Sequence, residues 1–266
     1  MDAAVAAEGE AQPFLSIRDV VVRFGGICAL NGVSFEMRRG EILGLIGPNG
    51  AGKTTLFNCL SRLYAPSSGS IVFRGRNVLQ MPASRIAGSG IGRTFQNVAS
   101  FANLTALDNI RIGAHSRFGG NFVGDALRLR GSRHTEREID AIAGALVDDL
   151  ELGEVALTPV RGLPFVLQKR VELARALASL PQLLLLDEPA GGLSHDEVAR
   201  LGELIRRLRD DRKVSILLVE HHMNLVMSVS DKVVVLNFGQ KIAEGPPAAV
   251  QNDGQVIHAY LGAGLQ

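Results

Sequence analysis

The sequence predicts an α/β fold with a mostly parallel core sheet, an antiparallel β subdomain and an α-helical subdomain. Three observations support this prediction. A glycine-rich loop at residues 47–54 (GPNGAGKT) stands between a strand-like apolar run, 42–46, and a helical pattern. A second run, 183–186, is four leucines without polar alternation, which is typical of a strand buried on both faces of a parallel sheet. Between residues 103 and 179 the apolar residues recur mainly at helical spacing.

The composition limits the possible functions. The chain has 266 residues, and its 28 Lys+Arg nearly balance its 27 Asp+Glu, which argues against bulk nucleic-acid binding through charge. Cys28 and Cys59 form no CxxC pair, so we expect a reducing compartment and no disulfide or metal framework. No segment is apolar for long enough to cross a bilayer, which predicts a cytoplasmic chain that can still work at a membrane through a partner. Residues 1–12, rich in Ala, Glu and Gly, are expected to be disordered.

The first elements in chain order are short strands. Residues 16–24, 33–37 and 70–74 are strand-like, and a Gly-Gly turn stands at 25–26, so we expect a small antiparallel sheet. Phe24 lies just before this turn. It offers an aromatic face for adenine, or it is one more apolar strand residue, and the residues alone favour neither interpretation.

The loop at 47–54 has the composition of an anion site. Its glycines let the backbone turn back on itself, so that several N–H groups and the positive end of the next helix point at one spot. Lys53 adds a positive charge where nucleotide phosphates would lie, and the Thr54 hydroxyl can coordinate Mg²⁺. A chance glycine turn ending in Lys-Thr is expected in roughly one such chain in a hundred. The flanking strand and helix therefore favour a P-loop that binds a nucleotide.

The middle of the chain changes to helical patterns. We expect helices at 103–112, 124–130, 135–152 and 168–179, separated by breaks at Gly119-Gly120 and Gly131. A basic run within them is most often a solvated helix face, although lipid headgroups or an acidic loop of a partner are alternatives; it consists of Arg128, Arg130, Arg133 and Arg137.

Two carboxylates follow the leucine run. Asp187 and Glu188 stand at the C-terminal end of the predicted strand, where open α/β sheets bind their ligands. Asp187 can hold Mg²⁺, directly or through water, and Glu188 can orient and polarise an attacking water. A lone Asp-Glu pair after a buried strand is usually a helix cap. With a P-loop in the same chain, the catalytic interpretation is favoured.

The last part of the chain completes the predicted sheet. Residues 194–197 have capping-box spacing and open an amphipathic helix. Residues 214–219 predict another strand, and His221 follows it at the same edge as Asp187. His221 is a structural histidine or a contact to the γ-phosphate, and we favour the contact. A closing hairpin and two short helices are predicted at 232–237, 241–243, 246–251 and 255–261.

The order of the motifs carries a family resemblance. After the P-loop come RTFQN at 93–97, LARAL at 173–177, LDEP at 186–189 and EH at 220–221, an order that resembles ABC-transporter ATPase subunits from residue 14 onward. Three further segments resemble most closely the ATP-binding subunit of branched-chain amino acid importers: AGGL at 190–193, IAEG at 242–245 and AYLG at 259–262. The insert after Ile112 also fits that subfamily.

The resemblance implies a P-loop (RecA-like) core at 13–95 and 180–266, which includes the β subdomain, and a helical subdomain at 96–179. It implies that Phe24 stacks on adenine and that nine residues wrap the phosphates: Gly47, Pro48, Asn49, Gly50, Ala51, Gly52, Lys53, Thr54 and Thr55. The implied cofactors are ATP and Mg²⁺, with metal contacts from Thr54, Gln96 and Asp187. The implied catalytic residues are Gln96, which also reaches the attacking water, Glu188 as general base, and His221 on the γ-phosphate.

The same resemblance implies the partners. They are a second ATPase subunit that closes face to face with this one, two transmembrane permease subunits and, indirectly, a periplasmic solute-binding protein, with no nucleic acid. Residues 191–194 are then a contact to the other ATPase subunit, and the chain lies peripherally at the cytoplasmic face of the inner (plasma) membrane. Branched-chain amino acids are the first cargo to consider, and other amino acids, urea and short amides stay open.

One segment departs from the family pattern. Where the family has Leu-Ser-Gly-Gly-Gln, residues 163–167 are LPFVL. Pro164 offers a phosphate neither a hydroxyl nor an N–H, Val166 replaces a glycine that allows close backbone approach, and Leu167 replaces an amide. We therefore hypothesise that the site completed by this segment on the partner turns over poorly. A heterodimer with unequal sites, which this reasoning favours, tolerates such a change, whereas a homodimer would have two weak sites.

Other classes fit less well. A GTPase of this type needs an Asn-Lys-x-Asp guanine reader, and no Lys of this chain follows an Asn. ABC ATPases of DNA repair or translation usually carry paired cassettes or long coiled-coil insertions, which are absent from the sequence. A nucleotide-gated adaptor that does not hydrolyse ATP is the main alternative, because of the altered 163–167 segment. The presence of Lys53, Asp187, Glu188 and His221 argues against it.

Overall fold

The computed structural model describes residues 13–94, 101–115, 117 and 130–263. Its larger sheet has six strands, in the spatial order β10 (Gln240–Gly245), β9 (Lys232–Asn237), β3 (Ile42–Ile46), β8 (Ser215–Val219), β7 (Leu183–Asp187) and β6 (Ile91–Arg93). All neighbouring pairs are parallel except β9 and β10, which form the antiparallel closing hairpin. The predicted mostly parallel core sheet is confirmed.

Both faces of this sheet are buried, and neighbouring strand residues pack into different apolar clusters. Leu184 and Leu186 of β7 belong to the cluster that includes helices α6 (His195–Arg212) and α7 (Met223–Val229). Leu183 and Leu185 belong to the cluster that includes helix α1 (Lys53–Leu60) and the smaller sheet. Because successive side chains of a strand point to opposite faces, a run of four leucines is what a strand between two layers requires.

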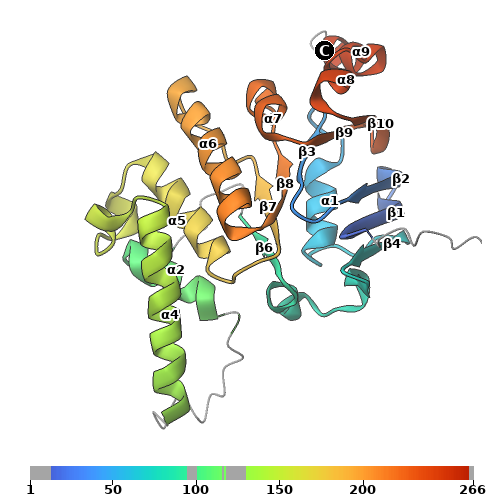
Figure 1. The fold of residues 1–266 in the computed structure, drawn as a ribbon. Coiled ribbons are helices and arrows are strands. Elements are labelled where there is room, and N and C mark those ends of the chain that lie inside the picture. The colour runs from blue at the N-terminus through green and yellow to red at the C-terminus, as the bar shows by residue number, and fades with distance from the viewer. Residues whose placement is uncertain (1–12, 95–100, 116, 118–129, 264–266) are drawn as a thin grey trace, which may run out of the picture.

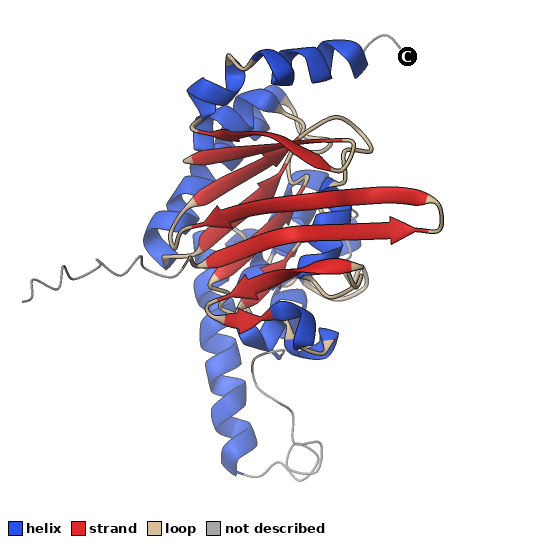
Figure 2. Cartoon of the chain, turned by 90° about the vertical axis from the view of Figure 1, so that its right-hand side faces the viewer, coloured by secondary structure: helices blue, strands red, loops and turns tan. Residues whose placement is uncertain are grey.

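The smaller sheet is antiparallel, with the order β2 (Ile27–Met37), β1 (Leu15–Phe24), β4 (Ser68–Phe73) and β5 (Arg76–Asn77). Figure 2 shows its long strands side by side in front of the larger sheet, and Figure 1 shows α1 between the two sheets. Strand β2 begins directly after the Gly-Gly turn, whereas the sequence predicted a strand only from residue 33. Exposed Asn31 and Gly32 interrupt the apolar alternation there, at an irregularity in the pairing with β1 between Leu30 and Val33.

The helical part consists of α2 (Ala106–His115), α4 (Arg130–Asp149) and α5 (Phe165–Leu177), which lie together at one end of the molecule (Figure 1). The predicted break at Gly131 is wrong, because α4 begins at Arg130 and includes Gly131 as its second residue. One glycine costs a helix only about 1 kcal/mol relative to alanine, which a helix of 20 residues can tolerate. Most of the predicted helix at 124–130 lies outside the described residues.

The remaining helices are short. Helices α8 (Pro247–Gln251) and α9 (Gly254–Ala263) follow β10 and end the described chain (Figure 1). Five 3₁₀ turns connect other elements: Val78–Gln80, Ala83–Arg85, Ala87–Ser89, Gly153–Val155 and Val160–Gly162. Among the residues that the structure describes, no helix combines the length and the apolar character needed to span a bilayer.

Candidate nucleotide-binding site

The glycine-rich loop connects the end of β3 to the start of α1, as the sequence predicted. Gly47 has φ +148° and Gly52 has φ +101°, a region that favours glycine. Space is equally restrictive, because a Cβ on Gly47 would lie 2.1 Å from the carbonyl oxygen of Leu236, and one on Gly52 would lie 2.6 Å from that of Ala29. The loop therefore takes a shape that side chains at these two positions would prevent.

The Lys53 ammonium lies inside the curve of the loop. Its Nζ donates hydrogen bonds to the carbonyl oxygens of Gly47, at 2.6 Å, and Pro48, at 3.0 Å. Burial lowers the pKa of Lys53, while the negative charges of Glu188 and Asp187 act in the opposite direction. A desolvated ammonium held only by carbonyl oxygens gains from an anion that enters the loop, because phosphate oxygens are stronger acceptors.

A cavity of about 680 Å³ joins this loop to two other predicted site residues, Glu188 and His221. It is lined by Ala29, Asn49, Gly50, Ala51, Gly52, Lys53, Thr54, Thr55, Glu188 and His221. Glu188 follows β7 and His221 follows β8, so the carboxyl ends of neighbouring parallel strands meet the loop at one edge of the sheet. The structure thus brings together nucleotide-binding and catalytic candidates from three distant parts of the sequence.

Asp187, the last residue of β7, is 1% exposed. Its Oδ2 accepts a hydrogen bond from Nη2 of Arg93 at 2.8 Å, and its backbone N–H donates to Oγ1 of Thr94 at 3.3 Å. Burial raises the pKa of Asp187, and the Arg93 guanidinium opposes this rise. The second oxygen, Oδ1, is buried without a hydrogen-bond partner among the described residues. A free carboxylate oxygen and the exposed hydroxyl of Thr54 are the hard oxygen donors that Mg²⁺ prefers, so the residues present fit this ion.

Glu188 has a strained backbone. Its φ is +47°, a conformation that costs a non-glycine residue about 1–3 kcal/mol, and its N–H donates to the carbonyl oxygen of Val219 at 2.9 Å. This turn ends the strand and places Glu188 on the cavity, with a carboxylate oxygen 4.0 Å from Nδ1 of His221. The helix-cap alternative does not describe Glu188, because α6 begins only at His195, where Glu197 accepts the N–H of Ser194 at 2.6 Å.

Glu220 is a supporting residue to which the sequence analysis assigned no role. Its carboxylate is fully buried and accepts three backbone N–H groups: Ala190 at 2.7 Å, His221 at 3.0 Å and His222 at 3.2 Å. Glu220 therefore joins the segment that follows Glu188 to the segment that carries His221. The sequence pattern that could have identified Glu220 is a carboxylate at the end of an apolar strand. A carboxylate there is buried, and a buried carboxylate needs hydrogen-bond donors.

Asp187 does not line the cavity at the Lys53 loop but another one, between α5 and α6. Two further predicted residues are less closely tied to the site. Phe24 is 45% exposed and does not line the cavity at the Lys53 loop either, and its ring lies edge-on to that of Tyr64, with 5.2 Å between the ring centres. Both interpretations of Phe24 therefore stay open. Gln96 lies outside the described residues, two positions beyond Thr94.

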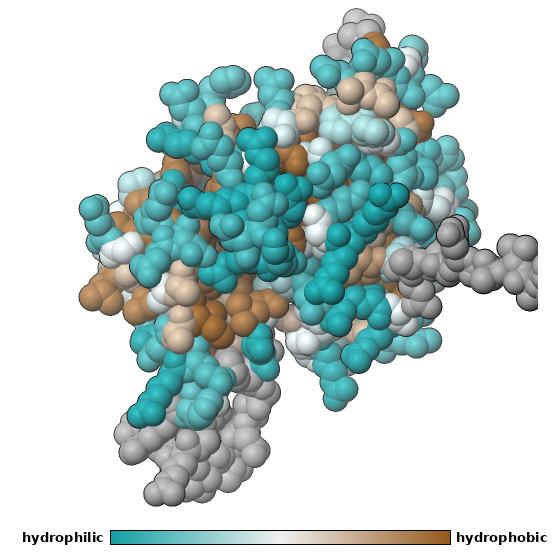
Figure 3. Space-filling view, in the orientation of Figure 1, coloured by the Kyte–Doolittle hydropathy of each residue, from teal (hydrophilic) through white to brown (hydrophobic). Residues whose placement is uncertain are grey.

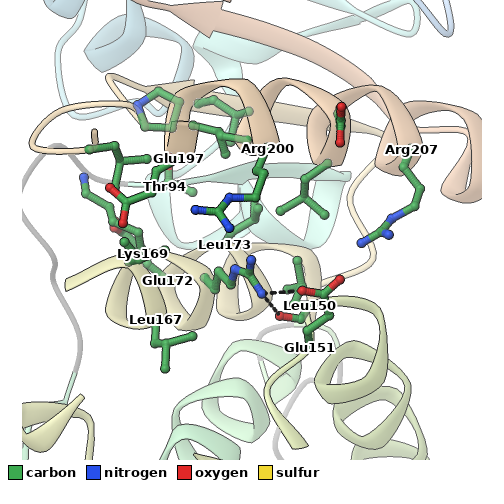
Figure 4. A pocket seen from close by; sticks show the side chains of 18 of the residues that line it. Thr94, Leu150, Glu151, Leu167, Lys169, Glu172, Leu173, Glu197, Arg200 and Arg207 are labelled. Carbon is green, nitrogen blue, oxygen red and sulfur yellow. Dashed lines mark hydrogen bonds and ion pairs between the residues drawn. The ribbon is translucent and has the colours of Figure 1, made fainter. Parts of the chain in front are cut away.

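The altered segment at 163–167 forms the start of α5. Pro164 precedes the helix, and the ring of Phe165 covers Gly192, where an added Cβ would lie 2.9 Å from Cε1 of Phe165. Val166 and Leu167 line a second cavity of about 560 Å³, between α5 and α6. Figure 4 shows this cavity, with charged side chains such as Arg200 and Arg207 on the α6 side. The helix start thus presents apolar side chains, with no side-chain hydroxyl or amide from residues 163–167.

The molecular surface differs over the helical part. On the face shown in Figure 3, most of the surface is hydrophilic, whereas hydrophobic side chains gather over the helical part at the lower left. Exposed apolar residues of this part include Phe101, Leu104, Leu157 and Phe165, and Leu157 is 77% exposed. Leu104 lies next to the Leu157 segment, because its carbonyl oxygen accepts the N–H of Val160 and Ala106 donates to Thr158.

Comparisons with known proteins agree with this architecture. A family model described as ABC transporter matches residues 30–191, and one described as branched-chain amino acid ATP-binding cassette transporter matches residues 240–265. The high-affinity branched-chain amino acid transport ATP-binding proteins BraF of Pseudomonas aeruginosa and LivG of Escherichia coli are each 40% identical over 251 residues. Each alignment covers 94% of this chain and 98% of the relative.

Solved structures give the same result. The crystal structure of the ADP conformation of an ATP-binding cassette of an ABC transporter has a TM-score of 0.82 at 26% identity, and the match covers 95% of this chain and 100% of that one. A nucleotide-free ATP-binding cassette has a TM-score of 0.79 at 25% identity. The fold and the family resemblance inferred from the sequence are confirmed. The chain belongs to the ABC transporter family as an ATP-binding subunit, a class of ATPases that bind nucleotide.

Proposed function

We propose that this chain binds and hydrolyses Mg²⁺-ATP to power the uptake of branched-chain or related amino acids across the cytoplasmic membrane. The observation that supports hydrolysis is the cavity in which the Lys53 loop meets Glu188 and His221. Asp187, directly before Glu188, adds a buried Oδ1 without a hydrogen-bond partner among the described residues. The cargo is supported by the names of BraF and LivG, which align over nearly their full length. An importer of urea or short amides is the alternative cargo class.

Each residue at the cavity has a defined task in this proposal. The loop from Gly47 to Thr55 wraps the phosphates, and Lys53 leaves the carbonyls of Gly47 and Pro48 to pair with them. Thr54 and Asp187 hold Mg²⁺, with Gln96 as a further ligand. When bound, the ion neutralises charge on the phosphates. Phe24 stacks on the adenine.

Glu188 and His221 act on the reacting end of the nucleotide. Glu188 orients the attacking water and accepts its proton, and His221 contacts the γ-phosphate. The 4.0 Å between Glu188 and Nδ1 of His221 supports a joint action on one reacting centre. The strained φ of Glu188 supports a functional rather than a structural role, because such conformations cluster at active sites.

The altered start of α5 supports a heterodimer. We propose that a different ATPase subunit, with an intact signature, completes the phosphate site of this chain, whereas the LPFVL segment completes a weaker site on that partner. Two observations support a weak second site. The segment offers no hydroxyl, no amide side chain and no N–H at Pro164, and the Phe165 ring covers Gly192. The exposed apolar residues of the helical part support docking to two transmembrane permease subunits at the cytoplasmic face of the membrane.

The decisive experiment measures single-turnover hydrolysis of ATP in the assembled complex, comparing the wild type with Glu188→Gln. We expect the variant to bind ATP normally and to hydrolyse it at least about 100-fold more slowly, because general-base catalysis contributes that much. Equal rates would instead favour the nucleotide-gated adaptor. Uptake of labelled leucine and of labelled urea by the same complex in vesicles separates the two cargo classes.

A second experiment tests the unequal sites. Val166→Gly with Leu167→Gln restores two signature residues, and the ATPase rate of the complex should rise. Ile257→Gln is a control, because it adds the same amide at an exposed position on α9, outside the helical part. No increase on restoration would contradict the impaired-signature hypothesis.

A further inference from the structure

The guanidinium of Arg93 lies where three elements of the site meet. Arg93 is the last residue of β6, and its Nη2 donates to Oδ2 of Asp187 at 2.8 Å. Its Nη1 donates to Oδ1 of Asn58 in α1 at 2.8 Å and to Oγ of Ser61, the residue directly after α1, at 3.0 Å. The guanidinium carbon also lies 5.6 Å from the centre of the Phe57 ring, and the Arg93 side chain is only 9% exposed.

From this geometry we propose that Arg93 is a positioning residue for the Mg²⁺-nucleotide site. It fixes one oxygen of Asp187 on the protein and leaves the other for the cation. It also sets the position of α1, whose first residues are Lys53 and Thr54, relative to β7, whose last residue is Asp187. The inference rests on the proposed function, since it assumes that the site takes Mg²⁺ and ATP.

The two carboxylate oxygens of Asp187 have different surroundings. Arg93 occupies Oδ2, and Thr94 accepts the Asp187 backbone N–H, so residues 93 and 94 hold this aspartate from two sides. Oδ1 stays without a partner among the described residues although it is buried. A buried carboxylate needs a compensating positive charge, which Arg93 supplies before a cation is bound. The arrangement presents one oxygen to the cation, in a fixed orientation.

Lys53 is a second cation near Asp187, and the two charges attract each other. Its Nζ nevertheless donates to the carbonyls of Gly47 and Pro48. Arg93 is the cation that is hydrogen-bonded to Asp187. Arg93 therefore keeps Lys53 available for phosphate, because an unpaired Asp187 would attract the ammonium to the position that the divalent cation needs.

Only an arginine provides this geometry at position 93. The planar guanidinium reaches Asp187 with one nitrogen and the side chains of Asn58 and Ser61 with another. A lysine at position 93 can neutralise Asp187, but its single ammonium lacks the rigid fork that joins α1 and β7. Charge and positioning can therefore be separated by substitution.

The experiment titrates a fluorescent ATP analogue into the full chain, once with Mg²⁺ and once with EDTA. In Arg93→Gln we expect the Mg²⁺-dependent gain in affinity to fall about tenfold or more, which corresponds to the loss of one hydrogen bond to a charged group. Binding in EDTA should change less than about threefold, because Lys53 and the loop stay in place. Arg93→Lys should lie between Arg93→Gln and the wild type.

Two further comparisons complete the test. Arg209→Gln is the matched control, because Arg209 also pairs with carboxylates, Asp210 and Asp231, but touches no residue of the cavity. Should Arg93→Gln fail to fold, Asn58→Ala combined with Ser61→Ala keeps the Asp187 pair and removes the hydrogen bonds from Arg93 to the end of α1. We expect about a threefold smaller Mg²⁺-dependent gain in that double variant, because its lost acceptors are uncharged and the ion pair with Asp187 is kept.

The results distinguish this inference from the proposed function. An unchanged Mg²⁺-dependent gain in folded Arg93→Gln, or in the double variant, would overturn the positioning role. An equal loss of affinity with and without Mg²⁺ would also overturn it, because it would indicate a merely structural residue. A wild-type chain that binds no ATP analogue under either condition would refute the proposed function itself.

Discussion

Replacing Glu220 by glutamine perturbs the buried carboxylate that joins the Glu188 segment to the His221 segment. In the wild type, Oε1 accepts the N–H of Ala190, and Oε2 accepts the N–H groups of His221 and His222. Glutamine keeps the shape but turns one of these oxygens into an NH₂ group, which is a donor. In either orientation of the amide, at least one backbone N–H then faces another donor.

The cost follows from this geometry. A hydrogen bond to a charged group contributes about 1.5–3 kcal/mol, and a buried donor left without an acceptor costs a further 1–3 kcal/mol or so. We expect the free energy of unfolding to fall by about 3 kcal/mol after partial relaxation. For a domain of roughly this size each kcal/mol lowers the melting temperature by about 2–4 °C, so the expected decrease is about 6–12 °C.

Urea unfolding and thermal unfolding of the isolated chain measure this loss. Glu203→Gln is the matched control, because Glu203 is exposed on α6 and the same substitution there should change stability by less than about 0.5 kcal/mol. A loss below about 1 kcal/mol for Glu220→Gln, with an unchanged dependence on urea, would refute the buried-carboxylate reasoning. ATP hydrolysis by the complex should also fall, because the positions of Ala190 and His221 become uncoupled.

Three further outcomes follow from the structure. Gly47→Ala should abolish binding of the ATP analogue in a chain with unchanged circular dichroism, because its Cβ would lie 2.1 Å from the Leu236 carbonyl oxygen; retained affinity would contradict this loop geometry. A maleimide reagent at pH 8 should modify Cys28 and spare Cys59 in the folded chain, since Cys59 is buried and burial raises its pKa to about 11; mass spectrometry after digestion reports both sites. Burial also raises the pKa of Tyr260 to about 12, so Cys59 and Tyr260 both lose their protons at lower pH in the unfolded chain than in the folded chain. The free energy of unfolding, measured in urea, should hold up to about pH 9 and decline from there to about pH 12. A profile without this decline would be inconsistent with the burial of these two residues.

The sequence identified the features that depend on local patterns. The strand, glycine loop and helix around Lys53, the leucine strand before Asp187 and the hairpin near the end of the chain all appear close to their predicted bounds. Each combines a regular hydrophobic period with residues whose backbone preferences mark the boundaries. These parts of the fold are therefore determined mainly by neighbours in the chain.

The supporting residues could not be found in this way. Arg93 contacts Asp187 across 94 positions of the chain, and Glu220 contacts Ala190 across 30, so no local period connects them. Strand β6 was missed for a related reason. It has only three residues, with Gly92 in the middle, and it exists as a strand because it pairs with β7. Tertiary context decides such elements more than propensity does.

The position of these supporting residues explains how the site is kept in shape. Its functional groups follow the carboxyl ends of parallel strands, and a group from another strand supports each of them: Arg93 of β6 holds Asp187 of β7, and Glu220, just after β8, holds Ala190 beyond β7. Because each support comes from a different strand, a substitution at a supporting residue acts on the function of its neighbour. The effects of Arg93→Gln and Glu220→Gln on the free energy of unfolding should therefore add, because the two residues share no partner among the described contacts. Their effects on the rate of hydrolysis should not add, because both act on the segment from Asp187 to Ala190. Unfolding and hydrolysis of the double variant measure the two quantities, and fully additive losses in both would contradict this account.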